Sequence, residues 1–149
     1  MKREDETMLE ARSFRASATA PRELPRRRVL LVDDSATVRS LVRVFLMGRS
    51  LEFVDAADGA VALAIARTET IDLIIVDYNM PRMDGLAFVR EIRKDAAVCR
   101  TPIIVLSADK TPSLRRDMLS SGAQEVLQKP VSKAFLGDAV ERLIGAVAR

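Results

Sequence analysis

The chain has 149 residues, 48% of them hydrophobic, which suits one domain with a single core. It has no histidine and one cysteine, Cys99, which excludes Ser-His-Asp and Cys-His catalysis, His-based zinc sites and an internal disulfide. No apolar run approaches the ~20 residues that span a bilayer, and the charged N-terminus lacks the apolar segment of a secretory signal. We therefore expect a cytoplasmic protein with no membrane association, in which any bound cation takes oxygen ligands.

The net charge of +3 lies entirely in residues 1–28, which carry eight Lys or Arg and five Asp or Glu. This segment has two prolines and few large apolar residues, so we predict a basic, disordered N-terminal extension followed by one domain at 29–149. The Arg26–Arg28 triplet raises the alternative of an arm for a nucleic acid, a membrane or a partner. The positive charges are diluted by negative ones, which favours a solvated extension and argues against a DNA-binding role.

From Val29 onward, five short apolar runs alternate with five longer amphipathic stretches. The runs are continuous rather than alternating, which is typical of strands covered on both faces. Ser35, Asp84, Thr111 and Ser132 have the residue types that begin helices, and Gly122 that of a helix end. The pattern predicts an α/β fold with five parallel strands and helices on both faces of the sheet. The expected strands are 29–34, 52–57, 72–77, 102–108 and 124–128, and the expected helices are 35–48, 58–69, 84–94, 111–122 and 131–149.

Polar residues stand where these strands end. Asp33 and Asp34 end the first run, Asp77 the third and Ser107 the fourth, and Lys129 follows the fifth. Ligands of open α/β sheets bind outside the carboxyl ends of the strands. We therefore expect these five side chains to converge on one rim. Any one of them alone has an ordinary interpretation, such as a helix N-cap for either of the paired acids.

Three carboxylates held close together repel one another, and a hard cation with oxygen ligands is the usual remedy. We expect Mg²⁺ with Asp34 and Asp77 as direct ligands, while Asp33 acts through a water or fixes the others. The second oxygen of Asp77 can then act as nucleophile and form an aspartyl phosphate. Lys129 can pair with one phosphoryl oxygen and the Ser107 hydroxyl can donate to another, because phosphoryl transfer depends on positioning and charge stabilisation. Backbone N–H groups near Asn79 and Ala108 can add donors.

The stretches "VLLVDDS", "DLIIVDYNMPRMDGL", "TPIIVLSA" and "GAQEVLQKP" resemble the receiver domain of bacterial two-component response regulators, specifically a stand-alone receiver like the chemotaxis regulators. The resemblance implies a flavodoxin-like, doubly wound, three-layer α/β/α fold with strand order 2-1-3-4-5. It makes Asp77 the phosphoacceptor, and makes Asp33, Asp34, Asp77 and the backbone carbonyl of Asn79 the Mg²⁺ ligands.

The same resemblance assigns roles to the remaining polar residues. Ser107 takes the Thr/Ser switch position, and Lys129 takes the position of the invariant lysine, with a cis bond to Pro130. Asn79 and Asp109 are expected to tune the rate of dephosphorylation. The domain is not expected to be an enzyme, except that it catalyses its own phosphorylation and dephosphorylation.

Two positions depart from the family pattern. Val126 stands three residues before the lysine, where the family usually has Tyr or Phe, and Val131 replaces a Phe often found after Lys-Pro. The aromatic switch coupled to the Ser/Thr position is therefore missing. The resemblance then leaves open how phosphorylation is communicated to the face that includes the last strand.

No stretch remains for an output domain, so we expect a single-domain response regulator, as a monomer or weak homodimer. It would accept its phosphoryl group from a sensor histidine kinase and signal by phosphorylation-dependent protein–protein interaction. Its partners would be that kinase, a phosphotransfer protein, a flagellar motor component or another regulator. The alternatives are a phosphorelay carrier that passes the group to a histidine, and an interaction module independent of phosphorylation. A hydrolase of the haloacid dehalogenase type is disfavoured, because it needs a second Asp where this chain has Asn79.

Overall fold

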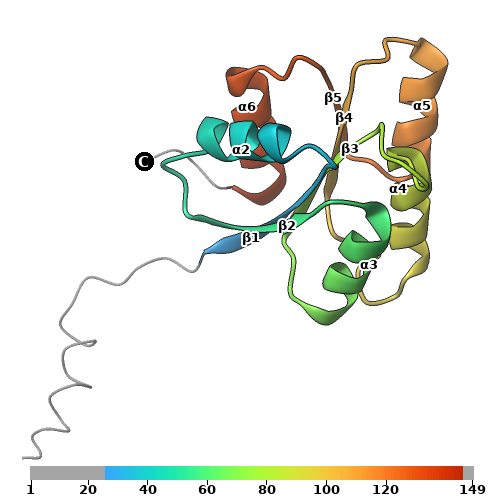
Figure 1. Cartoon of the computed structure of the whole chain (residues 1–149), viewed down its shortest axis with the longest axis horizontal. Coiled ribbons are helices and arrows are strands. Elements are labelled where there is room, and N and C mark those ends of the chain that lie inside the picture. The colour runs from blue at the N-terminus through green and yellow to red at the C-terminus, as the bar shows by residue number, and fades with distance from the viewer. Residues whose placement is uncertain (1–25, 146–149) are drawn as a thin grey trace, which may run out of the picture.

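The computed structural model describes residues 26–145, so nearly all of the expected N-terminal extension lies outside the described residues. Strands and helices alternate through this part of the chain (Figure 1). The strands are β1 (Arg27–Val32), β2 (Leu51–Ala56), β3 (Leu73–Asp77), β4 (Ile103–Ser107) and β5 (Glu125–Gln128). The helices are α2 (Ala36–Phe45), α3 (Gly59–Thr68), α4 (Gly85–Lys94), α5 (Pro112–Ser121) and α6 (Lys133–Ile144).

All five strands are parallel and form one sheet in the order β2-β1-β3-β4-β5, which confirms the predicted fold and strand order. Helices α3, α4 and α5 cover one face of this sheet, and α2 and α6 cover the other (Figure 1). Successive side chains of a strand enter opposite cores: Leu30 and Val32 pack with the first group, Val29 and Leu31 with the second. Because both faces are buried, the strands have continuous apolar sequences.

Side chains at the helix N-termini fix where the helices begin. Ser35 accepts a hydrogen bond from the Val38 N–H, and Asp58, Asp84 and Ser132 make the equivalent bond in their helices. The alternative that one of the paired acids caps the first helix is therefore wrong, because Ser35 is the cap. The expected end of α5 at Gly122 is confirmed, where φ is 123°.

The sheet begins two residues earlier than the expected domain boundary at Val29, because β1 includes Arg27 and Arg28. The Arg28 N–H donates to Asp72 Oδ2 at 2.7 Å, and its guanidinium lies 2.7 Å from Glu69 Oε1. Arg28 is therefore part of the folded domain rather than of a free basic arm. None of the helices within 26–145 is long and apolar enough to cross a membrane.

Candidate phosphoacceptor site

The adjacent strands β1 and β3 lie where the strand order reverses, and the acidic residues of the candidate site stand at their carboxyl ends. Asp33 follows β1 and Asp77 is the last residue of β3, so neighbouring parallel strands bring the two carboxylates to one edge. Carboxylate oxygens of Asp33, Asp34 and Asp77 lie within 4.8 Å of one another. The predicted convergence of these acids is therefore present in the structure.

The acids differ in their surroundings. Asp33 and Asp77 are 5% and 3% exposed, while Asp34 faces solvent. Asp33 Oδ1 accepts a hydrogen bond from the Ser35 N–H at 2.8 Å. Burial raises the pKa of the Asp33 carboxyl; the Ser35 N–H acts in the opposite direction, and the nearby charge of Asp77 raises that pKa again. This pocket therefore opposes the accumulation of negative charge.

Lys129 brings a positive charge to the same place. Its Nζ lies 2.5 Å from Asp77 Oδ1 and 4.0 Å from Asp33 Oδ2. Asp77 Oδ1 and Asp33 Oδ2 are buried, and within residues 26–145 each forms an ion pair with Lys129 but no hydrogen bond. A single ammonium shared by three carboxylates leaves net negative charge. These residues fit a divalent cation with oxygen ligands, since such an ion would satisfy both oxygens.

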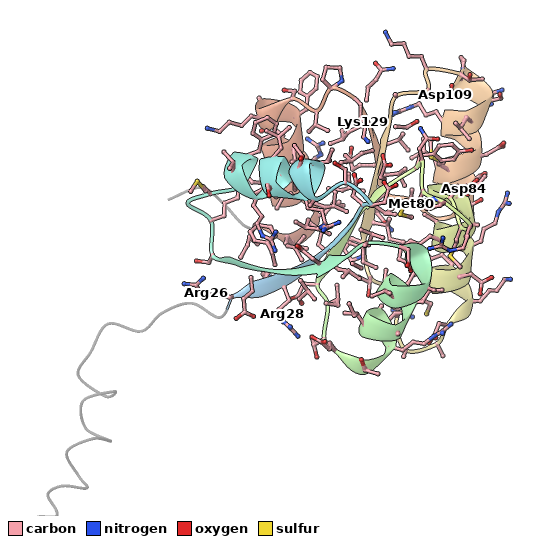
Figure 2. The ribbon with its side chains drawn as sticks, viewed as in Figure 1. Arg26, Arg28, Met80, Asp84, Asp109 and Lys129 are labelled. Carbon is pink, nitrogen blue, oxygen red and sulfur yellow. The ribbon has the colours of Figure 1, made fainter. Side chains whose placement is uncertain are left out.

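The backbone places Lys129 beside β4. The Lys129 N–H donates to the Ser107 carbonyl at 2.9 Å, which extends the pairing of the two strands by one bond. The Lys129–Pro130 peptide bond is cis, which confirms that prediction. Figure 2 shows Lys129 and Asp109 near one end of the sheet, and Arg26 and Arg28 near the other.

Ser107 ends β4 and is 1% exposed. Its hydroxyl oxygen accepts the Asp109 N–H at 3.1 Å, while the only acceptor for its hydrogen within the described residues is the Asp109 carbonyl at 3.5 Å. At that distance the hydrogen is only weakly bonded. It is therefore available to another acceptor.

The two residues expected to tune dephosphorylation, Asn79 and Asp109, are both exposed. Asp109 Oδ1 accepts the Thr111 N–H at 2.8 Å, and hydrogen bonds from Thr111 lower the pKa of Asp109. Asp109 is therefore ionised at neutral pH and held by the start of α5. Both side chains are therefore accessible to solvent and to an incoming group.

Arg39 on α2 is a residue of the site that the sequence did not single out. Its Nη1 donates to the Asp33 carbonyl, its Nε lies 3.4 Å from Asp55 Oδ2, and its side chain is only 15% exposed. Arg43 holds the same Asp55 with two hydrogen bonds of 3.0 and 2.6 Å. Arg39 therefore fixes the backbone of the acidic loop. The available signal was its position four residues after the helix cap Ser35, one turn along the helix.

Gly85 is a second such residue, since the sequence indicated only a helix start at the preceding Asp84. A Cβ at Gly85 would lie 2.8 Å from Tyr78 Cα and 3.0 Å from the Asp77 carbonyl oxygen. The Gly85 N–H also donates to the Tyr78 carbonyl at 2.8 Å. The absence of a side chain thus lets the start of α4 contact the end of β3 directly.

The described residues 29–141 match the family model of the response regulator receiver domain, and the chain belongs to this family. Receiver domains are phosphoacceptor signalling domains of two-component systems, phosphorylated by sensor histidine kinases, and they bind Mg²⁺ in an acidic site.

Among similar proteins, the gliding motility regulatory protein of Myxococcus xanthus is 37% identical over 141 residues, which is 91% of this chain and 18% of the relative. A protein-glutamate methylesterase/protein-glutamine glutaminase 2 of Chromobacterium violaceum is 35% identical over 126 residues, covering 80% of this chain and 35% of the relative. The chain thus spans well under two thirds of these relatives.

Solved structures match over more of their length. The chemotaxis response regulator CheY4 of Vibrio cholerae has a TM-score of 0.74 and 35% identity, covering 80% of this chain and 99% of that one. The receiver domain of sensor histidine kinase PA1611 from Pseudomonas aeruginosa, described with a magnesium ion coordinated in its active site cleft, has a TM-score of 0.73 and 31% identity. That match covers 80% of this chain and 98% of that one.

Proposed function

We propose that this receiver domain accepts a phosphoryl group on Asp77 from a sensor histidine kinase, in an Mg²⁺-dependent reaction, and signals by phosphorylation-dependent protein–protein interaction. The observation that supports this most is that two buried carboxylate oxygens, on Asp33 and Asp77, depend on the single ammonium of Lys129 for their pairing within the described residues. Three carboxylates share this one ammonium, so the pocket keeps an excess of negative charge that a divalent cation would balance.

The residues that would hold the cation are Asp33, Asp34, Asp77 and the backbone carbonyl of Asn79. When bound, Mg²⁺ supplies the positive charge that lets this acidic pocket receive a dianionic group. The use of oxygen ligands alone agrees with a chain that contains no histidine.

Asp77 would act as the nucleophile. One of its oxygens forms a bond to phosphorus while the bond between phosphorus and the histidine nitrogen of the donor breaks. Lys129 already contacts Asp77 Oδ1 at 2.5 Å, and it would pair with an oxygen of the arriving group. Ser107 would donate its weakly bonded hydrogen to another phosphoryl oxygen, and its oxygen keeps the N–H of Asp109. Hydrolysis would follow at a rate tuned by Asn79 and Asp109.

Phosphorylation would act as a switch by favouring one of two conformations that differ in partner affinity. The proposed partners are a sensor histidine kinase and a downstream phosphotransfer, motor or regulator protein. That this domain acts alone, without an attached output domain, stays a prediction.

A second function, that of a phosphorelay carrier, is favoured by Val126. Without the aromatic residue the family usually has there, the domain would pass its phosphoryl group to a histidine of another protein. Incubating the phosphorylated protein with histidine phosphotransfer proteins separates the two functions. Transfer of the group supports the carrier, and its retention together with a change in partner binding supports the switch.

The proposal is tested by intact mass spectrometry after incubation with acetyl phosphate, with Mg²⁺ or with EDTA. We expect one phosphoryl group on the wild type in Mg²⁺ only, and none on Asp77→Asn. The control is Asp117→Asn, an exposed residue of α5 far from the acidic cluster in sequence, which should be labelled like the wild type. Equal labelling of wild type and Asp77→Asn would refute the assignment.

A further inference from the structure

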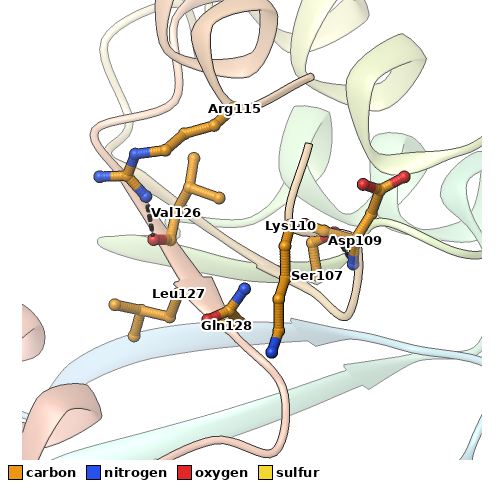
Figure 3. A pocket seen from close by; sticks show the side chains of 7 residues that line it. All are labelled: Ser107, Asp109, Lys110, Arg115, Val126, Leu127 and Gln128. Carbon is orange, nitrogen blue, oxygen red and sulfur yellow. Dashed lines mark hydrogen bonds between the residues drawn. The ribbon is translucent and has the colours of Figure 1, made fainter. Parts of the chain in front are cut away.

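A pocket of about 310 Å³ opens at the edge of the sheet opposite the candidate phosphoacceptor site. It lies between the C-terminal end of α3 and the segment that joins α4 to β4 (Figure 1), so it adjoins the residues that precede β3 and β4. We call it the α3–β4 pocket. The pocket drawn in Figure 3 is a different one, because its wall includes Ser107 and it therefore belongs to the site already described.

The floor of the α3–β4 pocket is apolar. Ala66, Ile71 and Val98 line it, and all three are buried members of the core on this face of the sheet. A cavity of about 150 Å³ between apolar side chains is large enough for benzene. A pocket of about 310 Å³ therefore has room for a branched aliphatic side chain together with a polar head group.

One side of the rim is negative. Glu69 is exposed, its Oε1 accepts a hydrogen bond from Arg28 Nη2 at 2.7 Å, and no hydrogen bond reaches its Oε2 from residues 26–145. Helix α3 ends at Thr68, directly before this carboxylate. The carbonyl groups of a last helical turn lack intrahelical partners and form the negative end of the helix dipole. Glu69 and the end of α3 therefore favour an ammonium group.

Arg67 gives the same rim a positive charge. Its Nε donates to Asp95 Oδ2 at 2.6 Å, which fixes the guanidinium, while its two terminal nitrogens make no hydrogen bond within the described part of the chain. The Arg67 side chain is 48% exposed. A guanidinium with free N–H groups can bind a carboxylate through two parallel hydrogen bonds. The hydroxyls of Thr70 and Thr101 add neutral donors and acceptors to the lining.

We propose that the α3–β4 pocket binds a free α-amino acid with an apolar side chain. The side chain occupies the floor, the carboxylate pairs with Arg67, and the ammonium pairs with Glu69 and the end of α3. A lining with one charge of each sign suits a zwitterion better than a phosphate or a metal ion, either of which would meet a charge of its own sign. The site uses none of the residues assigned to phosphoryl transfer, so it goes beyond the proposed function and does not depend on it.

The test is a titration of the full chain, carrying ¹³C-labelled Ile and Val methyl groups, with L-leucine, followed by NMR. We expect saturable shifts of the Ile71 and Val98 methyls, with a dissociation constant on the order of 1 mM, which is ordinary for so small a ligand. Two analogues each lack one charge: 4-methylpentanoate has no ammonium and 3-methylbutylamine has no carboxylate. Each should bind about fivefold more weakly than L-leucine. L-Serine, which lacks the apolar side chain, should bind about tenfold more weakly.

Two variants that remove a charge assign the polar contacts. Arg67→Gln should weaken L-leucine and 4-methylpentanoate about threefold without weakening 3-methylbutylamine. Glu69→Gln should weaken L-leucine and 3-methylbutylamine about threefold without weakening 4-methylpentanoate. The control is Arg116→Gln, at an exposed position of α5, which should leave the binding of all three ligands unchanged.

A pair of bulky variants locates the binding. Ala97→Phe, at an exposed position of the pocket wall, should weaken L-leucine about tenfold, while Ala96→Phe, exposed but outside the wall, should leave its affinity unchanged. Unchanged affinity in Ala97→Phe, or equal weakening of all three ligands by Arg67→Gln, would overturn the proposal. Methyls of Ile71 and Val98 that do not shift with L-leucine on the order of 10 mM would overturn it as well.

Discussion

The ammonium nitrogen of Lys129 lies 2.5 Å from Oδ1 of Asp77, and the same nitrogen lies 4.0 Å from Oδ2 of Asp33. One lysine from beyond β5 thus pairs with acids at the carboxyl ends of the adjacent strands β1 and β3. Since Lys129 is itself only a quarter exposed, its charge is poorly screened by water. Its removal should therefore change both the binding of cations and the chemistry at Asp77.

We predict that Lys129→Ala binds Mg²⁺ more tightly, by about three- to tenfold, because a competing positive charge is lost. Phosphorylation by acetyl phosphate should nevertheless fall by at least about tenfold, because the phosphoryl group loses its partner. Tyr78, the only tyrosine in a chain without tryptophan, stands next to Asp77, so its fluorescence can follow the Mg²⁺ titration. The exposed Lys133→Ala is the control, and weaker Mg²⁺ binding by Lys129→Ala would contradict this account.

The raised pKa of Asp33 predicts that the free energy of unfolding depends on pH in EDTA. Its pKa is raised on folding above 3.8, chiefly by burial, so the folded state resists its ionisation. The contribution of Asp33 to the free energy of unfolding is fully present below pH 3.8, and it is lost as the pH rises through the pKa of Asp33 in the folded state. Asp33→Asn keeps an acceptor for the Ser35 N–H and removes the charge.

This variant should melt about 2–6 °C higher than the wild type at pH 7 in EDTA, and the difference should vanish below the ordinary pKa of Asp. Added Mg²⁺ should stabilise the wild type more than Asp33→Asn. Thermal melts from pH 3 to 8, on the order of one per pH unit, measure both effects. A wild type that becomes more stable relative to the variant as pH rises in EDTA would contradict the prediction.

Arg39 should matter more for stability than its neighbour Arg43. Arg39→Ala removes a largely buried donor to the Asp33 carbonyl, and we expect a loss of about 1–3 kcal/mol in the free energy of unfolding. Arg43→Ala removes an ion pair with Asp55 in which the Arg43 side chain is 39% exposed. Because water screens this pair, its loss should lower the free energy of unfolding by less than about 1 kcal/mol. Urea denaturation compares the two. Equal losses would mean that the acidic loop does not depend on Arg39.

Gly85→Ala should destabilise the protein by about 2–4 kcal/mol, because its Cβ would meet backbone atoms of Tyr78 and Asp77. Gly48→Ala is a suitable comparison, since Gly48 has a φ of +86° but its added Cβ would meet no atom of the described residues within 4 Å, its chain neighbours aside. That variant should lose only about 1–2 kcal/mol from backbone strain. The comparison of the two by urea denaturation separates steric overlap from strain.

The sequence predicted the sheet and the site rim well because both depend on local patterns. Continuous apolar runs identify strands buried on two faces, and the residue that ends each run lies at the same edge of a parallel sheet. The convergence of Asp33, Asp77 and Lys129 could therefore be predicted from the sequence alone. The roles assigned to Ser107, Asn79 and Asp109 stay predictions.

The features that sequence reasoning missed depend on how the elements pack against one another. Arg28 belongs to β1 because Glu69 and Asp72, some forty residues away, provide its partners. Arg39 fixes the acidic loop through the Asp33 carbonyl, a contact that leaves little trace in composition or spacing. The need for Gly85 arises only where α4 meets the end of β3.

The most direct measurement is a crystal structure of the protein with Mg²⁺ and beryllofluoride. We expect beryllofluoride bonded to a carboxylate oxygen of Asp77. We also expect a cation that contacts the Asn79 carbonyl and at least one of the carboxylates of Asp33, Asp34 and Asp77. Lys129 and Ser107 should contact the fluorine atoms. Asp77 without beryllofluoride, with no cation among the three carboxylates and their side chains spread apart, would contradict this account.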